Sequence, residues 1–319
     1  MIYDAILVVS FGGPERREDV VPFLENVLRG KRVPRERLLE VAGHYYRLGG
    51  RSPLNDQVHA LLAALESDLR GRGILLPFYW GNRNWHPMLD DTVARMRRDG
   101  VRRALAFLTS AWSSYSSCRQ YLDNIDAARA ALDDAPAIDV IPPFGLSPDF
   151  LAIQTDLIGQ ARDRIPGGKG PRAKILFTAH SIPLAMAGAS RYESELREAA
   201  GRIAAGLGHH DWELVFQSRS GPPEQPWLEP DVGDAIRRSK VIRDLVIAPI
   251  GFLSDHMEVL YDLDIAAREV CRKQGVFMAR AATASSHPRF ASFTGGLIEA
   301  GLAGVRGCDP GCCSIPSRA

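Results

Sequence analysis

The sequence predicts an α/β protein built on parallel sheets, and three observations support this fold class. The chain has 319 residues, which is too long for one ordinary hydrophobic core and suits two α/β units. Short runs of β-forming residues alternate with longer amphipathic runs, as expected for parallel strands joined by right-handed helical crossovers. Several of the short runs are apolar without alternation, which is typical of strands buried on both faces.

The elements can be placed in order from these patterns. Strands, each a short apolar run, are expected at 4–10, 74–79, 103–109, 137–141, 174–179, 213–217, 244–250 and 276–281. Helices, each with an amphipathic pattern, are expected at 53–71, 86–99, 117–132, 148–164, 190–207, 231–239, 255–274 and 288–303. Eight strands could form one large sheet or two sheets of four. The Pro-rich segment 141–148 fits a hinge between two halves, although no convincing sequence repeat relates them.

Composition and charge exclude several classes of protein. Hydrophobic residues make up 45% of the chain and charged residues 24%, which is a globular composition. The formal net charge of +1 argues against nonspecific binding of nucleic acid, which needs a basic excess. No apolar stretch reaches the roughly 18–20 residues of a membrane span. The N-terminus lacks a basic leader and a cleavage site and reads as a buried strand, so we expect a cytoplasmic protein in which disulfides are disfavoured.

Two polar motifs follow predicted strands and carry groups that can bind a metal ion and accept a proton. His180 lies in Phe-Thr-Ala-His-Ser-Ile-Pro at 177–183, and Glu258 lies early in the helix that follows the strand 244–250. An imidazole at the carboxyl end of a strand can bind Fe²⁺ or take up a proton near neutral pH, and the alternative is a structural histidine in a loop. Asp262 lies one helical turn after Glu258, and these two carboxylates could also form a solvated acidic face.

Residues around these motifs have simpler interpretations as well. Asp255 fits the N-cap or first turn of the 255–274 helix, which is the interpretation we prefer for it. His256 is as consistent with packing as with function. The loop after 213–217 is rich in Gly and Pro and contains Trp227, which could pack in the core or form an apolar wall for a flat ligand.

The five cysteines are unevenly placed. Cys308, Cys312 and Cys313 crowd the C-terminus, and Cys118 lies far upstream. Four thiolates suit an iron–sulfur cluster or zinc, whereas stray thiols on a tail are the alternative. Cys271 falls inside a predicted helix and reads as a buried apolar residue.

The motif at 177–183 and the segment Phe-Leu-Ser-Asp-His-Met-Glu-Val-Leu-Tyr-Asp-Leu-Asp at 252–264 together resemble the active-site signature of the ferrochelatases, and the resemblance covers nearly the whole chain. It implies two Rossmann-like halves, each a four-stranded parallel sheet flanked by helices, with a porphyrin cleft between them. The halves would be residues 1–142 and 143–303, followed by a cysteine tail at 304–319. His180 and Glu258 would bind the substrate iron and accept protons, and Asp262 would belong to an acidic track.

The resemblance also implies contacts to porphyrin. The matching positions are Phe11, Arg29, Tyr45, Ser52, Arg83, Tyr121 and Trp227. Arg, Tyr and Ser donors suit the propionates, and Arg83 would lie at the lip of the cleft. In some coproporphyrin-type relatives a tyrosine that can touch the iron of the product stands where Phe11 is, and Phe11 has no ligand atom. Cys118, Cys308, Cys312 and Cys313 resemble the ligands of a [2Fe-2S] cluster found in some members.

The sequence is most similar to the coproporphyrin III ferrochelatases of actinobacterial type. The expected reaction is insertion of Fe²⁺ into coproporphyrin III to give coproheme in heme biosynthesis. Alternatives are insertion into protoporphyrin IX, a cobalt or nickel chelatase acting on another tetrapyrrole, and a non-catalytic porphyrin or heme carrier. Porphyrin and ferrous iron would be the substrates, and a downstream enzyme of the heme pathway is a possible partner.

Overall fold

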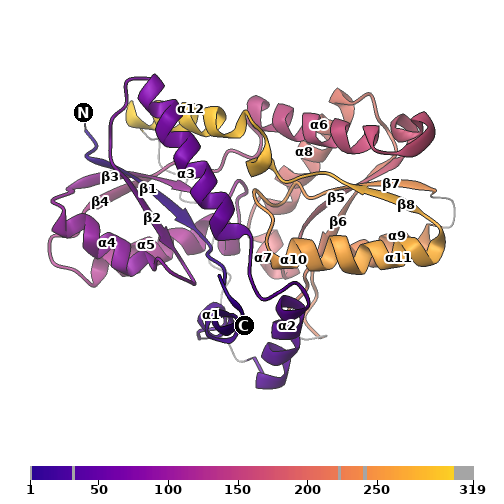
Figure 1. The fold of residues 1–319 in the computed structure, drawn as a ribbon, viewed down its shortest axis with the longest axis horizontal. Coiled ribbons are helices and arrows are strands. Elements are labelled where there is room, and N and C mark those ends of the chain that lie inside the picture. Colours follow the sequence, from indigo (N-terminus) through magenta and orange to yellow (C-terminus); the bar gives the residue numbers. More distant parts are fainter. Residues whose placement is uncertain (1, 31–32, 222–223, 240–242, 305–319) are drawn as a thin grey trace. The chain divides into compact units, whose positions relative to one another are not determined.

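A computed structural model of the chain describes residues 2–30, 33–221, 224–239 and 243–304. Within these ranges the strands form two parallel sheets, each of four strands (Figure 1). The first has the order β2-β1-β3-β4 and the second the order β6-β5-β7-β8. The predicted fold class, two Rossmann-like halves with helices on their sheets, is therefore confirmed.

The first sheet is built from β1 (Ala5–Ser10), β2 (Phe78–Asn82), β3 (Arg103–Leu108) and β4 (Ala137–Val140). Its central strand β1 is fully buried, which explains its unbroken apolar sequence. Figure 1 shows α3 (Leu54–Gly71) and α12 (Phe290–Leu302) on one face and α4 (Leu89–Arg98) with α5 (Gln120–Ala130) on the other. The helices α1 (Val20–Val27) and α2 (Arg35–Arg47) belong to the same unit and were not predicted.

The second sheet contains β5 (Lys174–His180), β6 (Trp212–Gln217), β7 (Asp244–Ala248) and β8 (Phe277–Arg280). Figure 1 shows α6 (Pro148–Asp163) and α8 (Tyr192–Gly206) on one face, with α9 (Val232–Arg238) and α11 (Arg268–Gln274) on the other. Two short helices, α7 (Leu184–Gly188) and α10 (Met257–Val259), follow β5 and β7. Of these, α7 was not predicted.

The chain crosses between the two units more than once. One unit contains the chain up to Ser110, the segment Cys118–Pro142 and the chain from Ala291. The other unit contains Ala111–Ser117 and Pro143–Phe290. The short piece Ala111–Ser117 is fixed within the second unit, because Trp112 Nε1 donates to the Ile250 carbonyl at 3.1 Å. The predicted boundary after residue 142 coincides with one crossing, and the predicted tail lies outside the described residues after Gly304. The division into separate folding domains stays a prediction.

Two element boundaries differ from the sequence-based ones for physical reasons. The strand expected at 74–79 begins only at Phe78, because the Ile74 amide still bonds to the Leu69 carbonyl at the end of α3. Leu75 is left 75% exposed as a result. The helix expected at 255–274 changes its winding: after α10 comes a π-helix, η5 (Leu260–Ala267), before α11 resumes α-geometry. Such π segments are rare and often mark functional sites.

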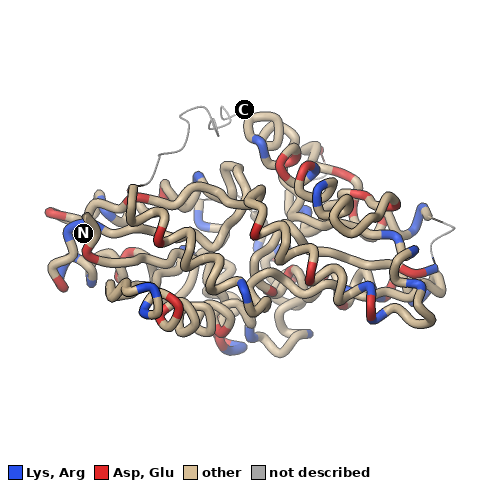
Figure 2. The backbone as a smooth tube through the Cα atoms, turned by 90° about the horizontal axis from the view of Figure 1, so that it is seen from above, with Lys and Arg blue, Asp and Glu red and all other residues tan. Residues whose placement is uncertain are grey.

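Charge is distributed evenly over the described chain. Figure 2 shows Lys and Arg interspersed with Asp and Glu along the backbone. Many of them pair within one helix, as Arg70 does with Glu66 at 3.0 Å and Arg197 with Glu193 at 2.7 Å. These exposed pairs contribute little stability each. The helices of the described part of the chain include none with the length and apolar character that a membrane crossing needs.

Candidate active site

His180 is the last residue of β5, whose preceding residues Ile175–Ala179 are all buried. Pairing in register with Gln217 at the end of β6 fixes its place in the sheet. Its carbonyl accepts a hydrogen bond from the Tyr192 hydroxyl at 3.1 Å. The strand ends there and Pro183 follows in the loop, so the imidazole lies at the carboxyl edge of the sheet, where parallel sheets bind their ligands.

A backbone contact selects the tautomer of His180. Its Nδ1 lies 2.5 Å from the carbonyl oxygen of Ser181. A carbonyl only accepts hydrogen bonds, so Nδ1 carries the proton and donates it. In the neutral ring the lone pair is therefore on Nε2, and a ligand or base function belongs to that atom.

Glu258, on α10, supplies the carboxylate that faces this atom. Glu258 Oε2 lies 3.5 Å from His180 Nε2, and the two side chains remain 43% and 32% exposed. The helix is oriented by its other face, because Val259, Leu263 and Ala267 pack in the core with Leu176 and Val215. The spacing of these apolar residues leaves Glu258 and Asp262 off the core face. The structure thus brings together the two groups that were predicted as ligands and proton acceptors.

The pKa of His180 reflects a balance of opposing effects. Burial disfavours the imidazolium, but the hydrogen bond and the charge of Glu258 outweigh burial and raise the pKa of His180 above its ordinary value. His256 shows the opposite result, because burial dominates and lowers the pKa of its ring. The His256 ring packs edge-on against Phe252 with centroids 5.0 Å apart, which supports the packing interpretation of this residue.

Asp262, in η5, extends the acidic side of the site. Burial, aided by the charge of Glu258, raises the pKa of Asp262 to about 6 despite a hydrogen bond from Ser218 that lowers it. Gln217 Nε2 also donates to Asp262 Oδ2, at 3.4 Å. Asp262 lines a cavity of about 170 Å³ together with Gln217, Ser218, Asp231 and Arg237. This part of the predicted site is therefore half-buried and polar and is not a fully solvated helix face.

Sequence reasoning missed the contribution of Gln217 and Ser218. Ser218 adopts a left-handed backbone conformation with φ +60, which is uncommon outside glycine and marks a constrained position. This conformation follows the end of β6 and accompanies the bond from the Ser218 hydroxyl to Asp262. The available signal was the polar Gln-Ser-Arg-Ser run directly after an apolar strand.

Several predicted porphyrin contacts gather in the first unit around Phe23. The Phe23 ring lies 6.2 Å from that of Phe11 and 5.9 Å from that of Tyr45. The Arg83 guanidinium lies 5.6 Å from the Phe11 ring and 4.5 Å from the Tyr121 ring. Tyr45 and Tyr121 are 8% and 5% exposed, so most of each ring is buried against protein. Their contact with porphyrin stays a prediction.

The other predicted contacts are placed differently. Arg29 is exposed and bonds through Nη2 to Asn26 Oδ1 at 2.7 Å. Ser52 is buried and its hydroxyl accepts from the Leu54 amide at 3.3 Å. Trp227 is 9% exposed, and its neighbour Gly221 has no room for a Cβ beside the indole ring. The Trp227 Nε1–H has no hydrogen-bond partner among the described residues, and the tight packing favours a core role for this ring.

Some of the cysteines lie within the described residues and others lie outside them. Cys118 is 3% exposed, within a π-helix at Tyr115–Arg119. Cys308, Cys312 and Cys313 lie outside the described residues, so only one of the four proposed cluster ligands can be placed. Cys271 is buried, and burial raises the pKa of its thiol to about 11, in agreement with an unreactive core residue. In the portion of the chain with a described structure, no three His, Cys, Asp or Glu side chains gather as a metal site.

The fold and the His180–Glu258 pair together define a class: an α/β protein of two parallel sheets with an imidazole and a carboxylate, both able to bind a metal ion, at the strand ends. Comparison with solved structures agrees with this fold. The structure is similar to CbiX, an enzyme of siroheme biosynthesis, with a TM-score of 0.54 at 19% identity over 93% of this chain and 98% of that one. It is similar to SirB from Bacillus subtilis with a TM-score of 0.55 at 11% identity, covering 95% and 98% of the two chains. At these identities the likeness shows the fold alone.

Sequence comparison then identifies the family. The ferrochelatase family model matches residues 3–302. A ferrochelatase of Rhodopirellula baltica is 53% identical over 301 residues, covering 93% of this chain and 86% of the relative. A coproporphyrin III ferrochelatase of Nocardia farcinica is 45% identical over 98% of this chain and 93% of the relative, and one of Mycolicibacterium smegmatis 46% over 97% and 94%. The chain belongs to the ferrochelatase family and is a metal-chelatase enzyme.

Proposed function

We propose that this ferrochelatase inserts Fe²⁺ into coproporphyrin III and produces coproheme. The observation that carries the proposal is the pair formed by His180 Nε2 and Glu258 Oε2, 3.5 Å apart at the carboxyl end of β5. An imidazole nitrogen and a carboxylate oxygen are both ligands for Fe²⁺, and both accept protons. The pair therefore combines the two capacities that metallation of a porphyrin requires.

The proton balance defines what these residues must do. One Fe²⁺ ion replaces two pyrrole N–H protons, so two protons leave the ring and the oxidation state of iron does not change. His180 can take one proton on Nε2 and Glu258 can take one on its carboxylate. Asp262, with its pKa of about 6, can receive a proton from Glu258 near neutral pH and lies beside a polar cavity. We propose that these three residues form a track that accepts protons and binds the incoming iron.

The choice of porphyrin is supported by the names of the relatives. Those from Nocardia farcinica and Mycolicibacterium smegmatis are named coproporphyrin III ferrochelatases. Coproporphyrin III has four propionates and protoporphyrin IX has two, so extra donors are needed. The exposed Arg29, with Arg83, Tyr45, Tyr121 and Ser52, is proposed for this role. Phe11 offers the ring an apolar contact.

Anaerobic insertion of Fe²⁺ into each porphyrin tests the proposal. Coproporphyrin III is expected to give the higher kcat/KM. A preference for protoporphyrin IX would instead support the alternative that the product is protoheme. Tight porphyrin binding without any insertion of Fe²⁺ would support a carrier, and insertion of Co²⁺ or Ni²⁺ but not Fe²⁺ would support a chelatase of another pathway.

The cysteines are proposed to hold a [2Fe-2S] cluster through Cys118, Cys308, Cys312 and Cys313. Support comes from the four thiols in a chain without predicted disulfides and from the burial of Cys118. Because iron insertion is not a redox reaction, the chemistry above needs no step through a cluster. We infer that its role would be structural, connecting the C-terminal residues to the body of the protein.

A further inference from the structure

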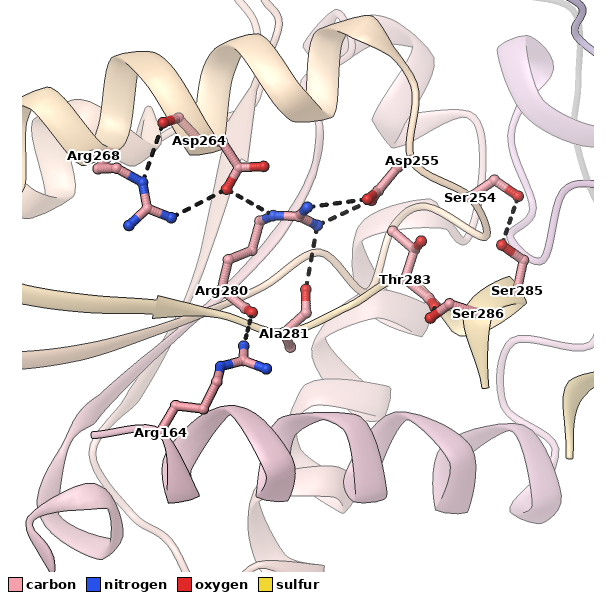
Figure 3. Close-up of polar contacts among 10 residues, drawn as sticks. All are labelled: Arg164, Ser254, Asp255, Asp264, Arg268, Arg280, Ala281, Thr283, Ser285 and Ser286. Atoms are coloured by element: carbon pink, nitrogen blue, oxygen red, sulfur yellow. Dashed lines mark hydrogen bonds and ion pairs between the residues drawn. The ribbon is translucent and has the colours of Figure 1, made fainter. Parts of the chain in front are cut away.

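Arg280, the last residue of β8, holds two aspartates of the segment that carries Glu258. Its guanidinium is bidentate to Asp255, with Nη1–Oδ1 and Nη2–Oδ2 distances of 3.0 Å, and its Nε donates to Asp264 Oδ1 at 3.0 Å (Figure 3). The Arg280 side chain is only 13% exposed, and Asp255 and Asp264 are 22% and 28% exposed. A fork geometry of this kind fixes both position and orientation of its partners.

The two aspartates that Arg280 binds flank Glu258 and Asp262 in the sequence. Asp255 precedes Glu258 by three residues, and Asp264 follows Asp262 by two within η5. One guanidinium thus connects both ends of the Asp255–Asp264 segment to the edge of the sheet. His256 is the residue before α10 and its backbone is extended, with no side-chain hydrogen bond capping the helix. The expectation that Asp255 caps the helix is therefore wrong, because its carboxylate is bound to Arg280 instead.

The chain around Arg280 is itself held in place. The Arg280 carbonyl accepts a hydrogen bond from Arg164, which directly follows α6 (Figure 3). Beyond the strand, the Ser285 amide donates to the Leu253 carbonyl at 2.7 Å, and Ser254 Oγ donates to Ser285 Oγ at 2.9 Å. The start of the Glu258 segment is therefore joined to the chain that follows β8 by side-chain and backbone bonds.

We propose that Arg280 is a positioning residue for metal insertion, because it holds Glu258 at its distance from His180 Nε2. This inference rests on the proposed role of Glu258. Glu258 lies on the short α10, which continues directly into the π-helix η5, and π segments are rare and often mark functional sites. The bonds from Arg280 to Asp255 and Asp264, which we call the Arg280 clamp, restrict the Asp255–Asp264 segment at both ends. A misplacement of about 1 Å in a reacting group can cost roughly 10²-fold in rate.

The chain offers matched variants. Arg280→Gln removes the charge and the fork, whereas Arg280→Lys keeps the charge and loses the bidentate geometry. Arg268→Gln is the control, because Arg268 also contacts Asp264, at 3.4 Å, but its side chain is 52% exposed and its Nε donates to the Asp264 carbonyl within the same helical segment. Rates are measured for Fe²⁺ insertion, together with KM for porphyrin and the thermal unfolding midpoint, at a temperature where every variant is folded.

We expect Arg280→Gln to lower kcat by about 10- to 100-fold and to leave KM for porphyrin unchanged. The kcat of Arg280→Lys should lie between those of Arg280→Gln and the wild type. The kcat of Arg268→Gln should equal that of the wild type. The decisive readout is the double variant with Glu258→Gln. If Arg280 acts through Glu258, adding Arg280→Gln to Glu258→Gln costs no further rate. Multiplicative losses, or a wild-type kcat in both Arg280 variants, would overturn the proposal. If Arg280→Gln does not fold, the same test is made with Arg280→Lys.

The design separates this inference from the proposed function. A Glu258→Gln enzyme with normal turnover would remove the proposed role of Glu258 and with it the basis of the clamp. A Glu258→Gln enzyme that loses activity beside fully active Arg280→Gln and Arg280→Lys enzymes would refute the clamp alone.

Discussion

Replacing Glu258 by Gln is the most informative change to the proposed site. The amide keeps the size of the side chain and one oxygen, but it can neither accept a proton at neutral pH nor contribute charge to a bound cation. Loss of a general base typically costs about 10²–10⁴-fold in rate. This range corresponds to about 2.7–5.4 kcal/mol of transition-state stabilisation. We expect the loss to appear in kcat for Fe²⁺ insertion, with porphyrin affinity retained.

The same substitution should move the pH dependence of the residual activity. Glu258 raises the pKa of His180, and burial opposes it. His180 must be unprotonated on Nε2 to bind iron or accept a proton, so activity rises with pH through its pKa. Without the Glu258 charge, burial dominates and the pKa of His180 falls. The acid limb of kcat/KM therefore shifts to lower pH in Glu258→Gln.

The assay is anaerobic Fe²⁺ insertion into coproporphyrin III, followed by the change in porphyrin absorbance from about one pH unit below to one above the acid limb of the wild type. His180→Ala serves as the reference, because it removes the titrating group and should remove most of the activity. An acid limb that stays in place, or moves to higher pH, would show that Glu258 does not control the protonation of His180. Turnover of Glu258→Gln at the wild-type rate would refute the catalytic assignment itself.

The remaining predictions concern Asp262 and the cysteines. Asp262→Asn should lower kcat by less than Glu258→Gln does, because Asp262 bonds to Ser218 and Gln217, whereas Glu258 faces His180 Nε2. A greater loss in Asp262→Asn would reverse the roles given to the two carboxylates. Protein purified without oxygen should show the visible absorption of a [2Fe-2S] cluster, which Cys118→Ser should bleach and Cys271→Ser should retain. Stoichiometric zinc in place of iron and sulfide would contradict the cluster.

The sequence was sufficient for the parts of the site that depend on strand ends. His180 follows an unbroken apolar run, and Glu258 begins the helix after another, so the topology of parallel sheets alone places both at carboxyl edges. The sequence was insufficient where the structure depends on how a helix is wound or on contacts between residues far apart in the chain. Nothing in the helical pattern of 255–274 distinguishes a π-helix at Leu260–Ala267 from an α-helix, because the apolar spacing of Val259, Leu263 and Ala267 fits either.

Polar contacts between residues far apart in the chain could not be predicted from the sequence either. Asp255 has the sequence position of a helix cap, and only the structure shows that Arg280, from a strand 25 residues later, takes its carboxylate. The helix α2 was not predicted, because its arginines obscure the buried Leu38, Ala42 and Tyr45 that lie at helical spacing. For Asp255, a local rule was applied where a distant partner determines the outcome.

The electrostatics of the second unit suit a reaction that moves protons without changing total charge. Fe²⁺ brings two positive charges and two protons remove two, so the site must pass protons onward and must not accumulate them. Burial and the charge of Glu258 raise the pKa of Asp262 to about 6, so this carboxyl group can take up and release a proton near neutral pH. Glu258 raises the pKa of His180 against the effect of burial and so favours proton uptake by its imidazole. The Arg280 clamp would set the distances between these groups, which would take protons from the ring and pass them on as the metal enters.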